Sequence, residues 1–351
     1  MSKPKTPTPK YDYAYSVGLI RTLETLLLNE NEVDRMILAP NAKEAFRILN
    51  EFDYADNKLG IEDPSEFQKV ITEGLMDIKE ELTKVTPDKR ILNILWHFYD
   101  FHNIKTLLKA KLGGKEYEEV EGMLNGMGAI PHIALKQFIF DKENSVQFKL
   151  DDEETENYIK AKIRKAEKEF EKHQNPQIID LYIDQKMMKI IFQVAEYSKN
   201  EFLITFVRKL IDLSNIKLFF RMKTQEKELE LYEIAFIRNG VIPFTKFKDA
   251  YAKGVADLPE EMKATHYANL IAEGYKEYEE SHTFLHLEKM CEDHLTDYIK
   301  SAKLIPFGPE PLIAYFLAKR NNALIIRMIL VSKLNQVDPE EIRKRLRKLY
   351  S

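Results

Sequence analysis

The stretch Asn103-Ile-Lys-Thr-Leu-Leu-Lys109 returns twice in this 351-residue sequence, as Asn215-Ile-Lys-Leu-Phe-Phe-Arg221 and as Asn321-Asn-Ala-Leu-Ile-Ile-Arg327. Each copy begins with Asn, has two apolar residues at its fifth and sixth positions and ends with a cation at its seventh. From Asn to Asn the copies lie 112 and 106 residues apart (215 − 103 and 321 − 215). This spacing predicts one helical unit that is used three times.

The similarity between the copies extends on both sides of the motif. Downstream, Pro131 and Pro243 each follow the motif Asn by 28 residues. Upstream, every copy has three apolar residues at the spacing of one buried helical face. These are Ile94, Leu95 and Phe98, then Phe206, Val207 and Leu210, then Leu312, Ile313 and Phe316.

Most of the chain has the sequence pattern of helices. Asp63-Pro64, Thr86-Pro87 and Asp338-Pro339 each combine a helix-capping side chain with a proline suited to the first helical position. No window shows sustained alternation of apolar and polar residues, and 12 glycines leave few positions for hairpin turns. The sequence therefore predicts an all-α fold.

The repeat also predicts the domain organisation. A period near 110 residues is too long for one turn of a helical solenoid, so each unit should be a helical bundle of its own, with a pseudo-threefold relation between the three bundles. We place the units at residues 11–125, 126–238 and 239–351, after a disordered Pro/Lys tail over residues 1–10.

Composition excludes several classes of protein. The 53 basic and 57 acidic residues leave a net charge of −4, which gives no electrostatic case for binding nucleic acid. The single Cys291 excludes an internal disulfide and is typical of a reducing compartment. The N-terminus has no apolar run of the secretory type, and no stretch approaches the roughly 18–20 apolar residues needed to cross a bilayer. We expect a soluble protein, or one peripheral to a membrane.

Two glycine-containing stretches resemble nucleotide-binding loops but lack their essential residues. Leu112-Gly-Gly-Lys115 is followed by Glu116 where a phosphate-binding loop needs Ser or Thr. Gly126-Met-Gly128 has Pro131 where a dinucleotide fingerprint needs its third glycine. We predict no nucleotide cofactor.

The other candidate chemical groups also favour structural interpretations. His282, His286 and His294 could share one helical face, but no Glu follows His282 as a hydrolytic zinc motif requires. Cys291 has no nucleophile signature, and the acidic run 151–154 is typical of a solvated helix start. The sequence thus predicts no catalytic, cofactor-binding or metal-ligating residue, no small-molecule substrate, and a protein that is not an enzyme.

The six polar positions that define the repeated motif have two interpretations, a structural one and one as an interface. They are Asn103, Lys109, Asn215, Arg221, Asn321 and Arg327. Three Asn and three cations could form a ring of polar contacts that faces a partner. We favour the structural alternative, in which each Asn bonds a neighbouring backbone and each cation extends into solvent.

Three stretches carry a resemblance to a known family. Tyr11-Asp-Tyr-Ala-Tyr-Ser-Val-Gly-Leu-Ile-Arg21, Asp100 to Lys111, and Glu310-Pro-Leu-Ile-Ala-Tyr-Phe-Leu-Ala-Lys319 with the helix after it resemble the C subunit of archaeal and bacterial A/V-type ATPases, which is related to the eukaryotic d subunit. Where that family usually has acidic residues after the Ala-Lys pair, this chain has Arg320, Asn321 and Asn322.

The resemblance implies a fold and a role. Members of the family have three similar helical domains arranged as a funnel and no catalytic residues. They join the proteolipid rotor ring to central stalk subunits at the cytoplasmic face of the membrane. Two alternatives stay open: a helical protein-binding scaffold unrelated to rotary ATPases, and an all-α metal-dependent enzyme that uses His282 and His286. The surfaces that meet the ring and the stalk, the coupling ion and the direction of ATP turnover are not determined by the sequence.

Overall fold

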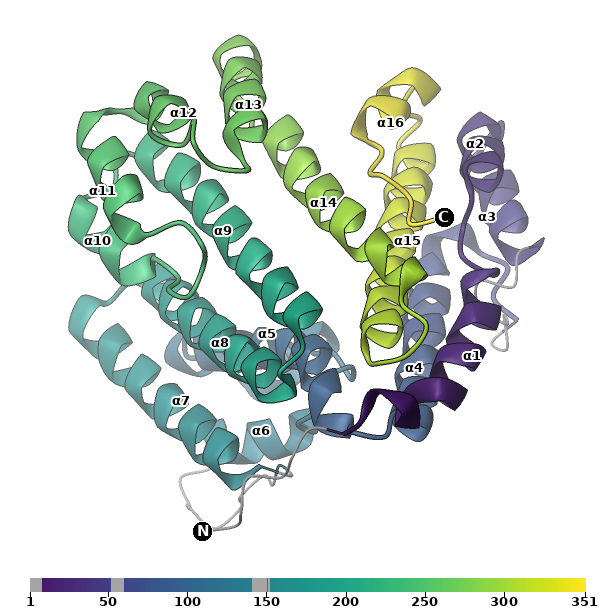
Figure 1. Cartoon of the computed structure of the whole chain (residues 1–351), viewed down its shortest axis with the longest axis horizontal. Helices are drawn as coiled ribbons and strands as arrows, with labels where there is room; N and C mark the ends of the chain where they lie inside the picture. Colours follow the sequence, from purple (N-terminus) through teal and green to yellow (C-terminus); the bar gives the residue numbers. More distant parts are fainter. Residues whose placement is uncertain (1–7, 52–59, 141–149, 151) are drawn as a thin grey trace. The chain divides into compact units, whose positions relative to one another are not determined.

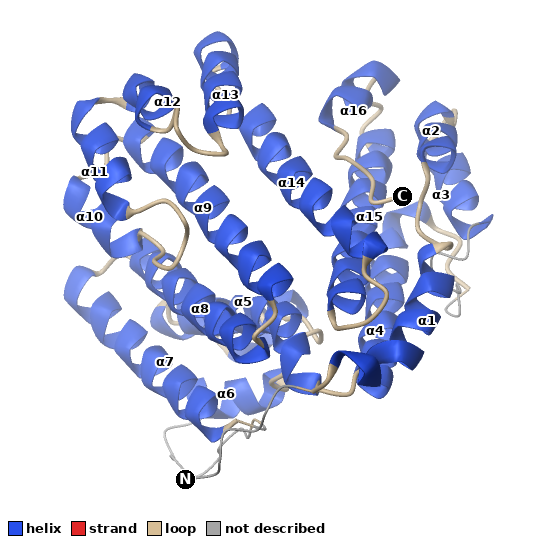
Figure 2. Ribbon diagram, viewed as in Figure 1, coloured by secondary structure: helices blue, strands red, loops and turns tan. Residues whose placement is uncertain are grey.

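The computed structural model describes residues 8–51, 60–140, 150 and 152–351. Every regular element in these ranges is a helix, which confirms the predicted all-α class (Figure 2). Residues 1–7 of the predicted disordered tail and Asp151 of the acidic run lie outside the described residues.

Sixteen α-helices are labelled in Figure 1 along the described ranges. Their bounds are α1 Ala14–Glu24, α2 Glu30–Leu38, α3 Ala42–Glu51, α4 Phe67–Val85, α5 Asn93–Leu112, α6 His132–Phe140, α7 Glu153–His173, α8 Pro176–Ser198, α9 Glu201–Thr224, α10 Leu229–Ala235, α11 Phe244–Lys253, α12 Leu258–Glu261, α13 Ala268–Ser281, α14 Leu285–Lys300, α15 Glu310–Leu334 and α16 Pro339–Arg345. Short 3-10 turns adjoin them, at Lys10–Tyr13, Pro64–Glu66, Lys89–Leu92, Tyr117–Glu119, Glu121–Met123, Val255–Asp257 and Ser301–Leu304.

Side-chain caps start several helices, as the sequence predicts at Asp63 and Asp338. The predicted start at Thr86-Pro87 is wrong, because the Thr86 hydroxyl has no hydrogen-bond partner among the described residues and the next regular element begins at Lys89. The Asp338 carboxylate accepts from the amide of Glu340, and Asn175 accepts from the amide of Gln177 at the start of α8. In α7 the Asp152 carboxylate accepts from the amides of Glu154 and Thr155. Each cap satisfies amides that a helix leaves without an internal partner, which places the helix start at a defined residue.

The chain divides into two compact units. The end unit combines residues 1–88 with residues 269–351, and the middle unit covers residues 89–268. The end unit is therefore built from both ends of the sequence. The predicted boundaries at residues 125 and 238, and the predicted pseudo-threefold, funnel-like arrangement, stay predictions.

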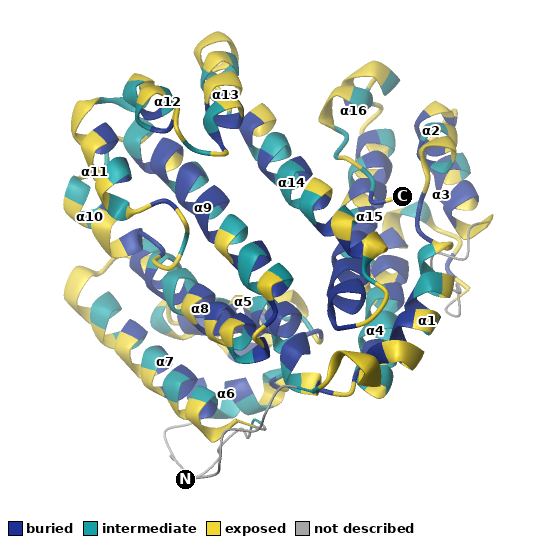
Figure 3. Ribbon diagram, viewed as in Figure 1, coloured by how far each residue is buried: buried dark blue, intermediate teal, exposed yellow. Residues whose placement is uncertain are grey.

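In the end unit, the long helix α15 is the centre of the core. Its first half is buried almost without interruption, and Figure 3 shows these turns as mostly buried. Its second half packs with the N-terminal helices α2, α3 and α4. This shared core contains Leu28, Val33, Met36, Ile37, Phe46, Leu49, Val70 and Ile71 from the N-terminal segment, and Ile325, Ile326, Ile329, Leu330 and Ile342 from the C-terminal one.

In the middle unit, α8 is the central element. It packs against α5, α7, α9 and α10, and Figure 1 shows α7, α8 and α9 following one another as neighbours. Beside it, Phe219 of α9 lies at the centre of an aromatic cluster with Phe220, Tyr232 and Tyr251. The Tyr232 and Tyr251 rings stack with their centroids 4.5 Å apart, a geometry that adds to the stability gained from burial alone.

Candidate functional site

The first copy of the motif fixes a loop to its own helix. Asn103 of α5 donates a hydrogen bond to the Asn125 carbonyl at 2.8 Å and accepts one from the Asn125 amide at 2.8 Å. One turn earlier, the buried Asp100 accepts from the Ile130 amide at 2.8 Å and lies 2.9 Å from His97 Nδ1. A Cβ atom on Gly128 would lie 2.2 Å from the Asp100 carboxylate, so the loop approaches this closely because residue 128 is Gly.

The second copy repeats this arrangement on α9. Asn215 donates to the Ile237 carbonyl at 2.8 Å and accepts from the Ile237 amide at 2.9 Å. Asp212 accepts from the amides of Val241 and Ile242, both at 3.1 Å, and from the Tyr267 hydroxyl at 3.2 Å. Burial raises the pKa of Asp212, and the two amides oppose that change.

The two copies also agree in spacing. In each, the bonded loop residues follow the Asn by 22 residues and the Asp by 30 residues. We name the Asp-x-x-Asn pair with its bound loop the helix-loop clamp. The sequence motif identified the Asn but missed Asp100 and Asp212, although Asp three residues before Asn in both copies was a readable signal.

The third copy, in the end unit, makes different contacts. Asn321 donates to the Lys348 carbonyl at 2.8 Å, and the Lys348 amide donates to Asp293 rather than to Asn321. In each of the three long helices, the last hydrogen bond from an amide to the carbonyl four residues earlier is donated by the residue just after the helix. These residues are Gly113, Gln225 and Asn335, which are 112 and 110 residues apart.

Aligned by these last amides, residues of α9 and α15 that are 110 apart correspond (335 − 225), whereas the sequence motif aligns residues that are 106 apart (321 − 215). The two alignments differ by four residues, which is about one helical turn. Ile325 is in register with Asn215, and Asn322 is in register with Asp212. Asn322 is fully buried, and neither polar atom of its side chain has a hydrogen-bond partner among the described residues. The departure at Arg320 to Asn322 noted in the sequence thus coincides with the loss of the clamp pattern.

The motif cations differ from one another in their surroundings. Lys109 Nζ lies 2.9 Å from Asp180 of α8, while Arg221 and Arg327 are exposed. Two further pairs, Lys105 with Asp184 at 2.5 Å and Lys111 with Glu167 at 2.7 Å, tie α5 to α8 and α7. Burial raises the pKa of Asp184, and Lys105 opposes this. Because the pairs at Lys109 and Lys111 are partly solvated, they set the packing of these helices more than they add stability.

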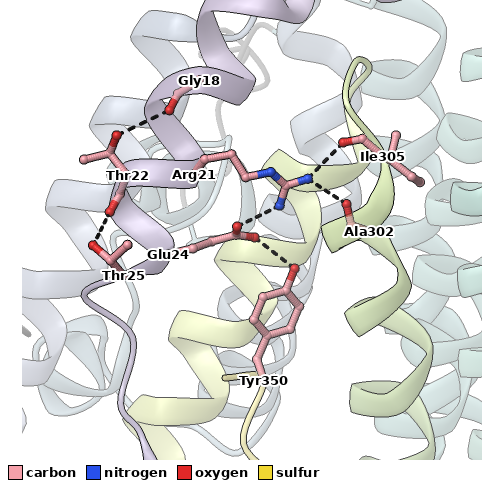
Figure 4. A network of polar contacts seen from close by, with 8 residues as sticks. All are labelled: Gly18, Arg21, Thr22, Glu24, Thr25, Ala302, Ile305 and Tyr350. Atoms are coloured by element: carbon pink, nitrogen blue, oxygen red, sulfur yellow. Dashed lines mark hydrogen bonds and ion pairs between the residues drawn. The ribbon is translucent and has the colours of Figure 1, made fainter.

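A polar network in the end unit joins α1 to the loop after α14. Figure 4 shows Arg21 reaching the carbonyls of Ala302 and Ile305, both at 2.9 Å, while it bonds Glu24 at 2.7 Å. The Tyr350 hydroxyl donates to Glu24 at 3.0 Å. An open depression of about 410 Å³ lies beside this network. Its lining residues are Ala14, Val17, Gly18, Arg21, Lys303, Leu304, Ile305 and Pro306.

Replacing Arg21 tests how much this network contributes to the free energy of unfolding. We expect Arg21→Met to lower the free energy of unfolding by about 1–2 kcal/mol, because two backbone carbonyls lose a charged donor while the aliphatic stem stays packed. Urea denaturation followed by circular dichroism measures the change. Arg47→Met, at an exposed arginine whose ion pairs with Glu44 and Glu51 lie at the surface, is the control and should leave the free energy of unfolding almost unchanged. An equal effect of both variants would contradict a structural role of the network.

The three histidines do not share one helical face. α13 ends at Ser281, and His282 has a left-handed backbone with φ of 54°, so the expectation of a common helix for His282 and His286 is wrong. A break between α13 and α14 separates them. Within the described part of the chain, no group of three or more His, Cys, Asp or Glu is placed to hold a metal ion. Cys291 is buried.

No helix in the described ranges is both long enough and apolar enough to span a bilayer.

Fold and contacts together define an all-α protein that contains a repeated helix-loop clamp. The model of the family described as "ATP synthase (C/AC39) subunit" matches residues 16–345. The chain therefore belongs to this family, as the sequence resemblance predicted.

Curated relatives match over nearly the whole chain. The C subunit of the A-type ATP synthase of Methanocaldococcus jannaschii is 26% identical over 360 residues, covering 95% of this chain and 86% of the relative. The C subunit of the V-type sodium ATPase of Enterococcus hirae is 23% identical, covering 95% and 97%. The C subunit of the A-type ATP synthase of Methanothermobacter thermautotrophicus is 23% identical, covering 96% and 88%. This chain is thus a subunit of the rotary ATPase type.

Proposed function

We propose that this chain is a non-catalytic rotor adaptor of a rotary A/V-type ATPase, which links the central stalk to the membrane proteolipid ring and transmits torque between them. The observation that carries the proposal is the family match over residues 16–345, together with relatives of nearly equal length that are named as C subunits. The proposed location is the cytoplasmic face of the membrane, where the protein is peripheral.

The helix-loop clamps support a mechanical role. In both copies, buried side chains of a long helix hold the following loop through several backbone hydrogen bonds. Buried hydrogen-bond networks of this kind rigidify the elements they join. An element that transmits torque must resist bending, and a clamped helix does this better than a helix followed by a free loop.

An exposed apolar patch in the end unit supports a docking role. Leu304 is 87% exposed and Tyr15 is 75% exposed, and the Tyr11 ring lies 5.3 Å from the Phe307 ring. Exposed apolar side chains that lie close together often mark a surface that a partner covers. We assign this patch, defined by Tyr11, Tyr15, Leu304 and Phe307, to the contact with one of the two proposed partners.

Binding to isolated partners tests the proposal. The tagged chain is incubated separately with the detergent-solubilised proteolipid ring and with the stalk subcomplex from the same source, and bound protein is measured after washing. We expect both to bind. If the chain bound neither partner while the stalk subunits still bound one another, the adaptor role would be contradicted. A helical protein-binding scaffold unrelated to rotary ATPases would then remain as the alternative.

A pair of variants tests the patch. Tyr15→Asp with Leu304→Asp should weaken binding to one partner by about tenfold or more, since burying a new carboxylate in an interface is costly. Leu285→Asp, at another exposed leucine of the end unit, is the control and should bind both partners normally. Unchanged binding of the double variant would exclude the patch without affecting the adaptor proposal.

A further inference from the structure

The middle unit carries a four-lysine cluster that the proposed function does not use. Helix α7 contains Tyr158-x3-Lys162-x2-Lys165, and α8 contains Tyr182-x3-Lys186-x2-Lys189. The spacings of four and three residues place each Tyr and its two Lys on one helical face. The same short pattern thus occurs on two helices that pack against each other.

The contacts across the two helices are reciprocal. Lys162 Nζ lies 4.6 Å from the centre of the Tyr158 ring, and Lys189 of the other helix lies 5.5 Å from the same ring. Lys186 Nζ lies 4.9 Å from the centre of the Tyr182 ring, and Lys165 of the other helix lies 5.9 Å from it. Each ring therefore receives one ammonium group from each helix, within the range of cation–π attraction.

The four lysines of this cluster have no ion-paired carboxylate in the described part of the chain. None of the four lysines forms an ion pair with a carboxylate in the described ranges, whereas the nearby Lys160 and Lys111 pair with Glu156 and Glu167. Glu169, the next residue of the α7 stripe, lies 3.8 Å from His173. Burial, with repulsion from the neighbouring cations, lowers the pKa of Lys162 and of Lys186. Four mutually repelling cations with no ion-paired carboxylate among the described residues form a surface that an anionic partner stabilises.

We propose that the four-lysine cluster, Lys162, Lys165, Lys186 and Lys189 over Tyr158 and Tyr182, is a docking surface for an acidic segment of a partner protein. Carboxylates spaced along that segment would pair with the four ammonium groups, which the two rings hold close together. The inference does not depend on the rotary role, since it follows from the charges of α7 and α8 alone.

Two other anionic partners fit the surface less well. A compact phosphate is typically held by free backbone amides, and these lysines lie within α7 and α8, where the amides are already bonded inside the helix. A membrane surface is typically entered by exposed apolar side chains beside the cations. Neither α7 nor α8 contains one of the exposed large apolar residues of the described chain, and Tyr182 is 7% exposed.

Fluorescence anisotropy with a labelled peptide of about ten glutamates tests the proposal at low salt, about 50 mM, where charge interactions are weakly screened. We expect the full chain to bind the peptide and Lys162→Glu with Lys186→Glu to weaken binding by about tenfold or more. The control, Lys43→Glu with Lys248→Glu, changes the net charge equally at exposed lysines elsewhere and should weaken binding by less than about threefold. Lys162→Arg with Lys186→Arg should keep binding, and circular dichroism verifies that each variant is folded.

Three outcomes would overturn the inference. The peptide fails to bind the unmodified chain; the control variant loses as much affinity as the cluster variant; or the cluster variant loses binding to tripolyphosphate or to phosphatidylglycerol vesicles while peptide binding is unchanged. The first means that no acidic segment is recognised, the second that net charge alone acts, and the third assigns the cluster to phosphate or lipid.

Discussion

Asp212→Ala is expected to lower the free energy of unfolding by about 3–5 kcal/mol, the largest loss among the substitutions considered for this protein. The carboxylate accepts from the amides of Val241 and Ile242 and from the Tyr267 hydroxyl, and alanine leaves all three donors without that partner. Each buried donor left unsatisfied costs about 1–3 kcal/mol, and relief from burying a carboxylate offsets part of the sum. Urea denaturation followed by circular dichroism measures the loss.

Two variants control for this result. Asp212→Asn keeps one acceptor oxygen for the Ile242 amide but places an amino group near the second donor, so we expect a smaller loss of about 1–2 kcal/mol. Asp249→Ala removes an exposed carboxylate of the same unit and should stay within about 0.5 kcal/mol of the unmodified protein. If Asp212→Ala proved no more harmful than Asp249→Ala, the clamp would not hold the loop.

Lys319→Met is expected to raise the free energy of unfolding by about 1–3 kcal/mol at pH 7. Lys319 is 3% exposed, and burial lowers its pKa from 10.5 to about 8. At pH 7 both the folded and the unfolded chain hold the charge, and burying it costs the folded chain free energy. Methionine is similarly long and carries no charge, so that penalty disappears.

The same lysine predicts a pH dependence. As pH rises above about 8, the folded chain releases the Lys319 proton, while the unfolded chain holds it to about 10.5. The unfolded state then binds more protons, so this residue makes stability rise with pH across that window. Denaturation of both proteins at pH 7, 8 and 9 should therefore show the advantage of Lys319→Met shrinking from about pH 8 upward.

The exposed Lys43→Met is the control for the charge change and should follow the unmodified protein at each pH. A constant difference between Lys319→Met and the unmodified chain from pH 7 to pH 9 would mean that the lysine does not titrate in this range. A loss of stability on Lys319→Met would mean that its polar contacts outweigh the cost of burial.

Part of the clamp was predictable from the sequence, and part was not. The repeated Asn with a fixed downstream proline indicated a repeated local arrangement, and Asn103 and Asn215 have matching loop contacts 22 residues on. The sequence has an Asp three residues before each of these Asn residues, but it does not indicate that Asp100 and Asp212 hold the next stretch of the same loop. A lone Asp in an apolar helix has several possible partners, and the loop path decides between them.

The third copy shows why a short motif alone is not sufficient. Asn321 and Arg327 match the motif in residue type, but the C-terminal hydrogen bonds of α15 place the third register one turn away. An amphipathic helix repeats its apolar positions at each turn, so a one-turn slip keeps the pattern of apolar residues and escapes detection by sequence. Only the hydrogen bonds at the ends of α9 and α15 show which residues of the two helices correspond.

The sequence by itself determined the helical class, the capped starts at Asp63 and Asp338 and membership of the ATP synthase C/AC39 family, because these depend on local periodicity, side-chain caps and residue order. The tertiary structure alone decided that both ends of the chain build one unit around α15, and that two short Tyr-Lys patterns on α7 and α8 form a single cationic surface. Such contacts join residues distant in the sequence, and local patterns contain no information about which distant faces will pack together.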